Sequence, residues 1–233
     1  MRINKFLAEC GVASRRSCDR LIAEGKVTIN GKRAALGDNA EEADEVCVEG
    51  VPVRHRQVHS YFLLNKPKGY VCTVRDDRGR KTVMDLMPDG AGRLFPVGRL
   101  DYDTEGMLIM TDDGELAFRL THPKNEVPKT YLAKIEGTIS EAELNRLRAG
   151  VEIDGKLTGK CKVKVIETSK EYTKLQVVIT EGRNRQVRKM FEAVGKNVCF
   201  LKRVAIGDMR LGSLPRGKAR KLSPDEVFYL KNL

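Results

Sequence analysis

Between residues 61 and 206, the chain carries a series of short apolar or alternating segments, and these constrain the fold most strongly. Lys160-Cys-Lys-Val-Lys-Val-Ile166 alternates polar and apolar residues, which predicts a strand with one face in water. Strand candidates occupy residues 61–64, 107–110, 130–135, 161–166, 175–180 and 198–206. Strands on this count outnumber helices and do not alternate regularly with them. The pattern therefore favours an α+β fold with a mixed, mostly antiparallel sheet over a doubly wound parallel sheet.

Two helices are marked within this region. Ser140-Glu-Ala-Glu143 is a capping box, and Gly150 closes the helix that it begins. The second helix has apolar residues at helical spacing from Val187 to Val194 and stops at Gly195. We expect both helices to flank the sheet.

The first 52 residues predict a separate, smaller unit. A helix is expected over residues 3–9, and Ser14 is a suitable N-cap for a second helix. Asn30-Gly31 indicates a tight hairpin, and an alternating strand follows at residues 45–49. We expect a helix-hairpin domain at 1–52, a polar linker at 53–60 and a larger domain at 61–233.

The charge balance points to a polyanionic partner. Lys and Arg total 43 against 32 for Asp and Glu, a net charge of +11. Basic side chains release counterions when they neutralise phosphates, so this excess favours nucleic acid. In the first domain the basic residues expected to contact RNA are Arg2, Lys5, Arg15, Arg16 and Lys32.

Other classes of protein are disfavoured. No apolar run approaches the roughly 18 residues of a membrane span, and Glu9 interrupts the amino-terminal apolar segment, so we expect a cytoplasmic protein that binds no membrane. The six cysteines form no C-x-x-C pair and do not cluster with histidines. They are expected to be small buried groups, and no zinc site is predicted.

The stretch Gly98-Arg-Leu-Asp-Tyr-Asp-Thr-Glu-Gly-Met-Leu108 has three carboxylates at alternate positions. Its acidic residues fit the spacing of a calcium loop, but Pro96 and Gly98 disfavour the helix that such a loop needs before it. A magnesium-dependent phosphotransferase would need a preceding buried parallel strand. A turn-forming acidic loop is the third alternative, and the stretch alone leaves all three open.

Further motifs occur in a fixed order around this stretch. Leu64-Asn-Lys-Pro-Lys-Gly69 precedes it, and Lys129-Thr-Tyr131, Glu181-Gly-Arg-Asn-Arg-Gln-Val-Arg-Lys-Met190 and Phe200-Leu-Lys-Arg203 follow. Together with the amino-terminal unit, the chain resembles the RsuA/RluB type of ribosomal RNA pseudouridine synthases, whose first domain is shared with ribosomal small-subunit protein S-four. The resemblance covers nearly the whole chain.

The resemblance implies a pseudouridine synthase fold and site-specific isomerisation of uridine in ribosomal RNA. In that family Asp101 matches the nucleophile, Arg188 the arginine beside it, and Tyr131 the tyrosine that stacks on the target base. Leu201 matches an apolar residue under the site, and Arg99 an arginine that fills the space of a flipped base. Asp103 and Glu105 match no catalytic position and are expected to organise the loop through hydrogen bonds to its backbone, with Gly106 relieving the backbone. Lys66, Arg183 and Arg185 lie in the matching motifs and are expected to contact RNA.

The reaction needs no cofactor and no metal, and the resemblance implies a monomer. The segment around Arg183 looks more like the enzymes of the large subunit, so 23S ribosomal RNA is the expected substrate. Two alternatives stay open: the same chemistry on 16S ribosomal RNA, and a noncatalytic ribosome-assembly factor that binds RNA. Whether Asp101 attacks the base or the ribose also stays open.

Overall fold

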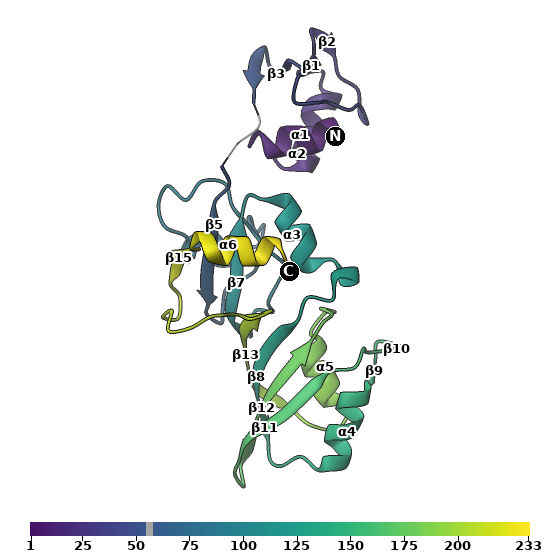
Figure 1. Ribbon diagram of the computed structural model, residues 1–233, viewed down its shortest axis with the longest axis vertical. Coiled ribbons are helices and arrows are strands. Elements are labelled where there is room, and N and C mark those ends of the chain that lie inside the picture. Colours follow the sequence, from purple (N-terminus) through teal and green to yellow (C-terminus); the bar gives the residue numbers. More distant parts are fainter. Residues whose placement is uncertain (55–57) are drawn as a thin grey trace. The chain divides into compact units, whose positions relative to one another are not determined.

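The computed structural model describes residues 1–54 and 58–233, and it divides into two compact units (Figure 1). One unit comprises Met1–Ser60 together with Asp112–Gly114. The other comprises Tyr61–Thr111 and Glu115–Leu233. No helix within the described ranges is long and apolar enough to cross a bilayer.

Two helices and a four-stranded antiparallel sheet build the amino-terminal unit. Helix α1 spans Ile3–Glu9 and α2 spans Arg15–Ala23, where the Ser14 side chain accepts a hydrogen bond from the Ser17 amide. The strands lie in the order β2-β1-β3-β4. Their bounds are β1 Val27–Ile29, β2 Lys32–Arg33, β3 Val46–Val48 and β4 Val51–Val53. The predicted helices and strands of this unit are confirmed.

The hairpin between β1 and β2 follows from two residues with positive φ. Asn30 has φ 50° and Gly31 has φ 75°, as a type I′ turn requires. Val53, which we expected in the linker, is the last residue of β4 and pairs with Val46. Residues 55–57 of the predicted linker lie outside the described residues.

A large mixed sheet forms the second unit, with strand order β11-β12-β8-β13-β7-β5-β15 (Figure 1). Short strands β14 and β6 add to it beside β13 and β7, and β9 with β10 forms a separate hairpin. All pairs described in this sheet are antiparallel except β7 with β13. The predicted α+β class with a mostly antiparallel sheet is confirmed. The bounds are β5 Tyr61–Lys66, β6 Phe95–Pro96, β7 Glu105–Thr111, β8 Lys129–Glu136, β9 Glu152–Ile153, β10 Lys156–Leu157, β11 Lys162–Thr168, β12 Tyr172–Ile179, β13 Val198–Ile206, β14 Met209–Arg210 and β15 Ala219–Lys221.

The parallel pair depends on a glycine. Gly106 has φ +108°, and a Cβ atom added there would lie 2.1 Å from the carbonyl oxygen of Arg203. Only a residue without a side chain lets β7 approach β13 this closely. Gly106 therefore allows the end of the acidic loop to pack directly against β13, the strand that carries Leu201 and Arg203.

Helices cover both faces of the sheet. Leu116 and Leu120 of α3 share one core with Met107 and Ile109, and α6 adds Leu230. Helices α4 and α5 belong to the other core, which includes Leu108. The helix bounds are α3 Gly114–Thr121, α4 Glu141–Ala149, α5 Gln186–Glu192 and α6 Pro224–Lys231, with short 3-10 helices η1 Val83–Leu86 and η2 Pro123–Asn125.

The capping box that predicted α4 is present. The Glu143 amide donates to Ser140 Oγ, and the Ser140 amide donates to a Glu143 carboxylate oxygen. The prediction that the cysteines are buried is wrong for most of them: Cys18 is buried, but Cys199 is exposed and the other four are half-buried.

Candidate active site

A cavity of about 130 Å³ opens in the second unit, beside the acidic loop. That volume is roughly ten times the minimum needed to hold one water molecule, so the cavity accommodates a larger group. Its walls come from segments far apart in the sequence. The residues that concern the chemistry are Arg99, Asp101, Thr104, Lys129, Tyr131, Glu181, Arg183, Arg185, Leu201 and Arg203.

Lys66, at the end of β5, holds the Asp101 loop from within the protein. Its side chain is 0% exposed, and Nζ donates to the carbonyl oxygens of Pro67 (3.1 Å), Asp101 (3.0 Å) and Thr104 (2.9 Å). Burial lowers the pKa of Lys66, and nearby acidic groups oppose that shift. The prediction that Lys66 contacts RNA is therefore wrong, because the ammonium is buried and its hydrogen bonds go to the loop backbone.

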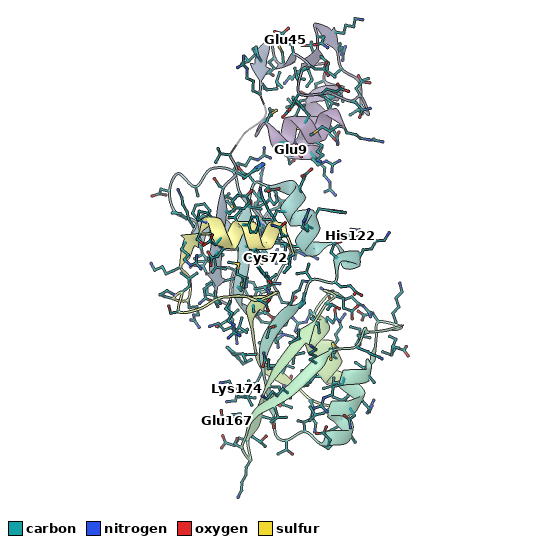
Figure 2. The ribbon with its side chains drawn as sticks, in the orientation of Figure 1. Glu9, Glu45, Cys72, His122, Glu167 and Lys174 are labelled. Carbon is teal, nitrogen blue, oxygen red and sulfur yellow. The ribbon has the colours of Figure 1, made fainter. Side chains whose placement is uncertain are left out.

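A second contact anchors the other side of the same loop. The Leu100 amide donates to the Sγ atom of Cys72 at 3.3 Å. Cys72, labelled in Figure 2, is half-buried in this unit. The backbone on both sides of Asp101 is thus tied to groups from the segment 66–72.

The other carboxylates of the loop bind arginines. Asp103 pairs with Arg185 and with Arg188, each at 3.1 Å, and buried Glu105 pairs with Arg216 at 3.1 Å. Burial alone would raise the pKa of Asp103, but the hydrogen bond from Arg185 and the charges of both arginines lower it. Asp103 and Glu105 are thus structural. Both bind arginine side chains. The carboxylate of Asp103 also accepts a hydrogen bond from its own backbone amide, as predicted for the loop, whereas the contact described for Glu105 is with Arg216.

The strand and the ion pairs that follow Asp101 also argue against a calcium-binding loop. An EF-hand loop leads into a helix, whereas Glu105 is the first residue of strand β7. Its carboxylate, like that of Asp103, is already matched by a guanidinium.

Arg188 is buried in α5 and faces the acidic loop. Its Nη1 donates to the Val198 carbonyl at 2.7 Å, and Nη2 donates to the Asp103 carbonyl at 3.1 Å. Nε is buried, and no hydrogen-bond partner for it occurs within residues 1–54 and 58–233. The sequence predicted this cation beside Asp101, but its ion pair is with Asp103, two residues further along the loop.

Tyr131 and Leu201 form an apolar part of the cavity wall. They are 8% and 3% exposed and lie on the neighbouring strands β8 and β13. Tyr131 pairs with Arg203 across the two strands, and Leu201 pairs with Ala133. An aromatic ring and an aliphatic side chain from adjacent strands suit the faces of a planar ring.

Comparisons with known proteins agree with this geometry. The profile of the RNA pseudouridylate synthase family matches residues 60–193, and the S4 domain profile matches residues 1–46. The chain belongs to the RNA pseudouridine synthase family. An S4 domain followed by the synthase domain is the arrangement of the RsuA/RluB type, as the sequence motifs predicted.

Individual relatives cover the whole synthase. It is 44% identical to the ribosomal large subunit pseudouridine synthase B of Bacillus subtilis, over 100% of this chain and 96% of the relative. It is 37% identical to the dual-specificity RNA pseudouridine synthase RluF of Salmonella typhi, over 100% of this chain and 79% of the relative. A crystal structure of a pseudouridylate synthase superposes with a TM-score of 0.72 at 32% identity and covers 99% of both chains.

The three arginines of the synthase domain that are expected to contact RNA differ in exposure and in the partners that their guanidinium groups already have. Arg99 is exposed and lines both the cavity and an adjoining groove. Arg185 is exposed but paired with Asp103. Arg183 donates to the carbonyl oxygens of Lys156, at 3.1 Å, and Ile153, so its guanidinium already supports the β9–β10 hairpin. Of the three, Arg99 is the most available to RNA.

The basic residues of the S4 domain are mostly accessible. Arg2, Arg15, Arg16 and Lys32 are exposed. Lys5 is half-buried and pairs with Glu9 at 3.4 Å. Four of the five predicted contacts are therefore open to a polyanion.

Sequence reasoning missed two cations of the synthase cavity, Lys129 and Arg203. Burial, and then the charge of Arg203, lower the pKa of Lys129 to about 8. A signal was present in the sequence. Each lies two residues from a predicted site residue on the same strand, Tyr131 or Leu201, and i, i+2 neighbours share a face.

Proposed function

We propose that this enzyme isomerises a specific uridine of large-subunit ribosomal RNA to pseudouridine, with Asp101 as the nucleophile. The observation that carries the proposal is the cavity in which the Asp101 loop faces Tyr131 and Leu201. The choice of RNA follows the name of the Bacillus subtilis relative, a ribosomal large subunit pseudouridine synthase.

The reaction breaks one bond to the ribose and forms another. The bond between uracil N1 and C1′ breaks, and C5 bonds to C1′. C5 then loses its proton, and N1 gains one. A carboxylate that adds to the substrate and leaves again is sufficient, because the rearrangement is internal to the nucleotide and uses no external oxidant or reductant. Asp101 forms its bond either to uracil C6 or to C1′.

The structure supports Asp101 as a carboxylate in position to react. Lys66 and Cys72 fix the backbone around it, and the ion pairs of Asp103 anchor the loop to α5 through Arg185 and Arg188. Asp103 and Glu105 form ion pairs with arginines. Among the three carboxylates of the loop, Asp101 is the one that lines the cavity. Fixed geometry of this kind supplies a large share of catalytic rate in general.

We propose that the target nucleotide leaves its helix to enter this cavity. Extruding a base costs a few kcal/mol of stacking, and contacts with the enzyme must offset it. Tyr131 and Leu201 offer an apolar wall for the base. Arg99, exposed at the rim two residues before Asp101, is positioned to occupy the vacated space.

The S4 domain supplies sequence-independent affinity. Its exposed basic residues suit phosphate contacts, which position an enzyme on its RNA without selecting a base. We propose that the enzyme works as a monomer, which light scattering in solution tests directly.

Mapping of pseudouridine in both large ribosomal RNAs, in cells with and without the gene, tests the proposed substrate. We expect one modification to be lost from the large-subunit RNA and restored by the native gene but not by one that encodes Asp101→Asn. Loss from the small-subunit RNA instead would overturn the assignment of the RNA. Unchanged maps of both RNAs would leave only an RNA-binding role.

A further inference from the structure

Two cations line the catalytic cavity without a carboxylate of their own. In the described part of the chain, neither Lys129 nor Arg203 forms an ion pair. The carboxylates that line the cavity are Asp101 and Glu181. Glu181 already accepts hydrogen bonds from the Gly159 amide and the Gln186 side chain. The cavity wall thus carries positive charge that its own residues do not neutralise by contact.

Arg203 is the more unusual of the two. It is 3% exposed, and its Nε donates to the Met107 carbonyl at 2.8 Å. Its Nη2 is buried and has no hydrogen-bond partner among the residues that the structure describes. A buried donor without an acceptor is costly and uncommon in folded proteins, so an unpaired guanidinium nitrogen at a cavity wall indicates a missing acceptor.

Lys129 places a second positive charge nearby. Its Nζ donates to the Val127 carbonyl at 2.8 Å, and Arg203 is the charged group that acts on it. Two like charges in a partly desolvated site repel each other, and an electron-rich group between them would relieve that repulsion. The pair is therefore suited to hold an oxygen that carries negative charge.

We propose that Arg203 and Lys129 bind the carbonyl oxygen of the flipped uracil that becomes negatively charged during the reaction. This inference rests on the proposed function. If Asp101 adds to C6, the electrons of the C5–C6 double bond move to the ring carbonyl and form an enolate. If it attacks C1′, the electrons of the N1–C1′ bond leave with the base, and the ring carbonyls share the charge. In both cases, donors at these oxygens stabilise the intermediate more than the starting base.

A phosphate is the other oxygen-rich group that a flipped nucleotide offers. Arg203 lies on the strand that contributes Leu201, and both side chains are at most 3% exposed. A phosphate remains part of the RNA backbone and keeps most of its water, whereas a base enters the cavity. The burial of the guanidinium thus favours the base oxygen.

The experiment measures single-turnover tritium release from large-subunit ribosomal RNA labelled at uracil C5, with enzyme in excess, and the Kd for the same RNA. Arg203→Met and Lys129→Met remove the charges, and Arg203→Lys retains one. The matched control is Lys202→Met, because Lys202 is the neighbour of Arg203 on β13 and points to the opposite face of the sheet. Circular dichroism and thermal melting check that each variant folds.

We expect Arg203→Met to lower the rate at saturating enzyme by about 10²- to 10³-fold and Lys129→Met by about tenfold or more, with Kd changed by less than about threefold. Arg203→Lys should recover part of the rate, and Lys202→Met should match the native enzyme. If Arg203→Met does not fold, Arg203→Lys and Lys129→Met decide the question by the same two measurements.

Folded variants of both residues with native rates would overturn the inference. A loss confined to Kd would also overturn it, since that would indicate a phosphate contact. Absence of tritium release from the native enzyme and from Lys202→Met would instead contradict the proposed function.

Discussion

Replacing Lys66 with methionine removes the ammonium that holds the Asp101 loop while keeping most of the side-chain volume. Lys66 makes hydrogen bonds of 2.9 to 3.1 Å to three carbonyl oxygens, and its side chain is fully buried. Hydrogen bonds to a charged group contribute roughly 1.5–3 kcal/mol each, but removal of the ammonium also relieves a desolvation cost of several kcal/mol. The net loss in the free energy of unfolding therefore depends on the carbonyl oxygens that lose their hydrogen-bond donor.

Those acceptors are the carbonyls of Pro67, Asp101 and Thr104. A buried polar group without a partner costs about 1–3 kcal/mol. The contact with the Thr104 carbonyl is buried, whereas those with the Pro67 and Asp101 carbonyls are partly buried, so their loss costs less. We therefore expect Lys66→Met to lower the free energy of unfolding by about 2–4 kcal/mol. The catalytic rate should fall about 10²-fold, because a displacement of about 1 Å at a reacting group has that effect.

Urea unfolding and single-turnover tritium release measure the two quantities. The control is Lys68→Met, because Lys68 is exposed and its ammonium lies 5.5 Å from the Phe200 ring, where it contributes about 0.5–1 kcal/mol. A Lys66→Met enzyme that keeps its stability within about 0.5 kcal/mol and its rate within about threefold would show that the Lys66 ammonium does not hold the Asp101 loop in place.

Three further predictions concern the same cavity and its loop. Asp103→Asn should lower the single-turnover rate but change the free energy of unfolding by less than about 1 kcal/mol, because the Asp103 side chain is 43% exposed and buried Arg188 keeps its hydrogen bonds to two backbone carbonyls; equal rates would count against its anchoring role. Gly106→Ala should destabilise the fold by more than about 4 kcal/mol in urea unfolding, because its Cβ would overlap the Arg203 carbonyl, whereas Gly114→Ala meets no atom within 4 Å and should differ by less than about 1 kcal/mol. Lys129 is protonated below its pKa of about 8 and neutral above it, so the rate should fall as pH rises through that value, and Lys129→Met should remove this dependence. The titratable and charged groups that share the cavity with Lys129 are Arg99, Asp101, Tyr131, Glu181, Arg183, Arg185 and Arg203.

Local signals in the sequence were sufficient for most of the fold. The capping box at Ser140 and the Asn30-Gly31 turn specify backbone geometry over a few residues, and the structure contains both. Helix α6 has the same kind of signal, a capping box from Ser223 to Glu226 with Pro224 at its start. We did not predict it, because its apolar residues do not follow a clear helical period. The parallel pairing of β7 with β13 depends on a contact between distant segments, so no local pattern specifies it.

Some residues of the candidate site could likewise be predicted from the sequence, whereas their contacts depend on tertiary packing. The family resemblance was sufficient to select Asp101 and Tyr131, and both line the cavity. It could not show that Lys66 is buried, since a lysine beside a proline and a glycine in sequence looks like a surface residue. The partner of Arg188 was likewise set by packing, which brings α5 to Asp103. Charge partners depend on tertiary distances, and a sequence pattern does not contain them.

If Asp101 carries out the chemistry, single-turnover tritium release from C5-labelled large-subunit ribosomal RNA depends on its carboxylate. Asparagine keeps the size of the side chain and the backbone contacts of the loop but removes the nucleophile. We predict that the native enzyme releases tritium and that Asp101→Asn releases none, while both bind the RNA with similar Kd. Equal release by the two proteins would show that the Asp101 carboxylate is not the nucleophile.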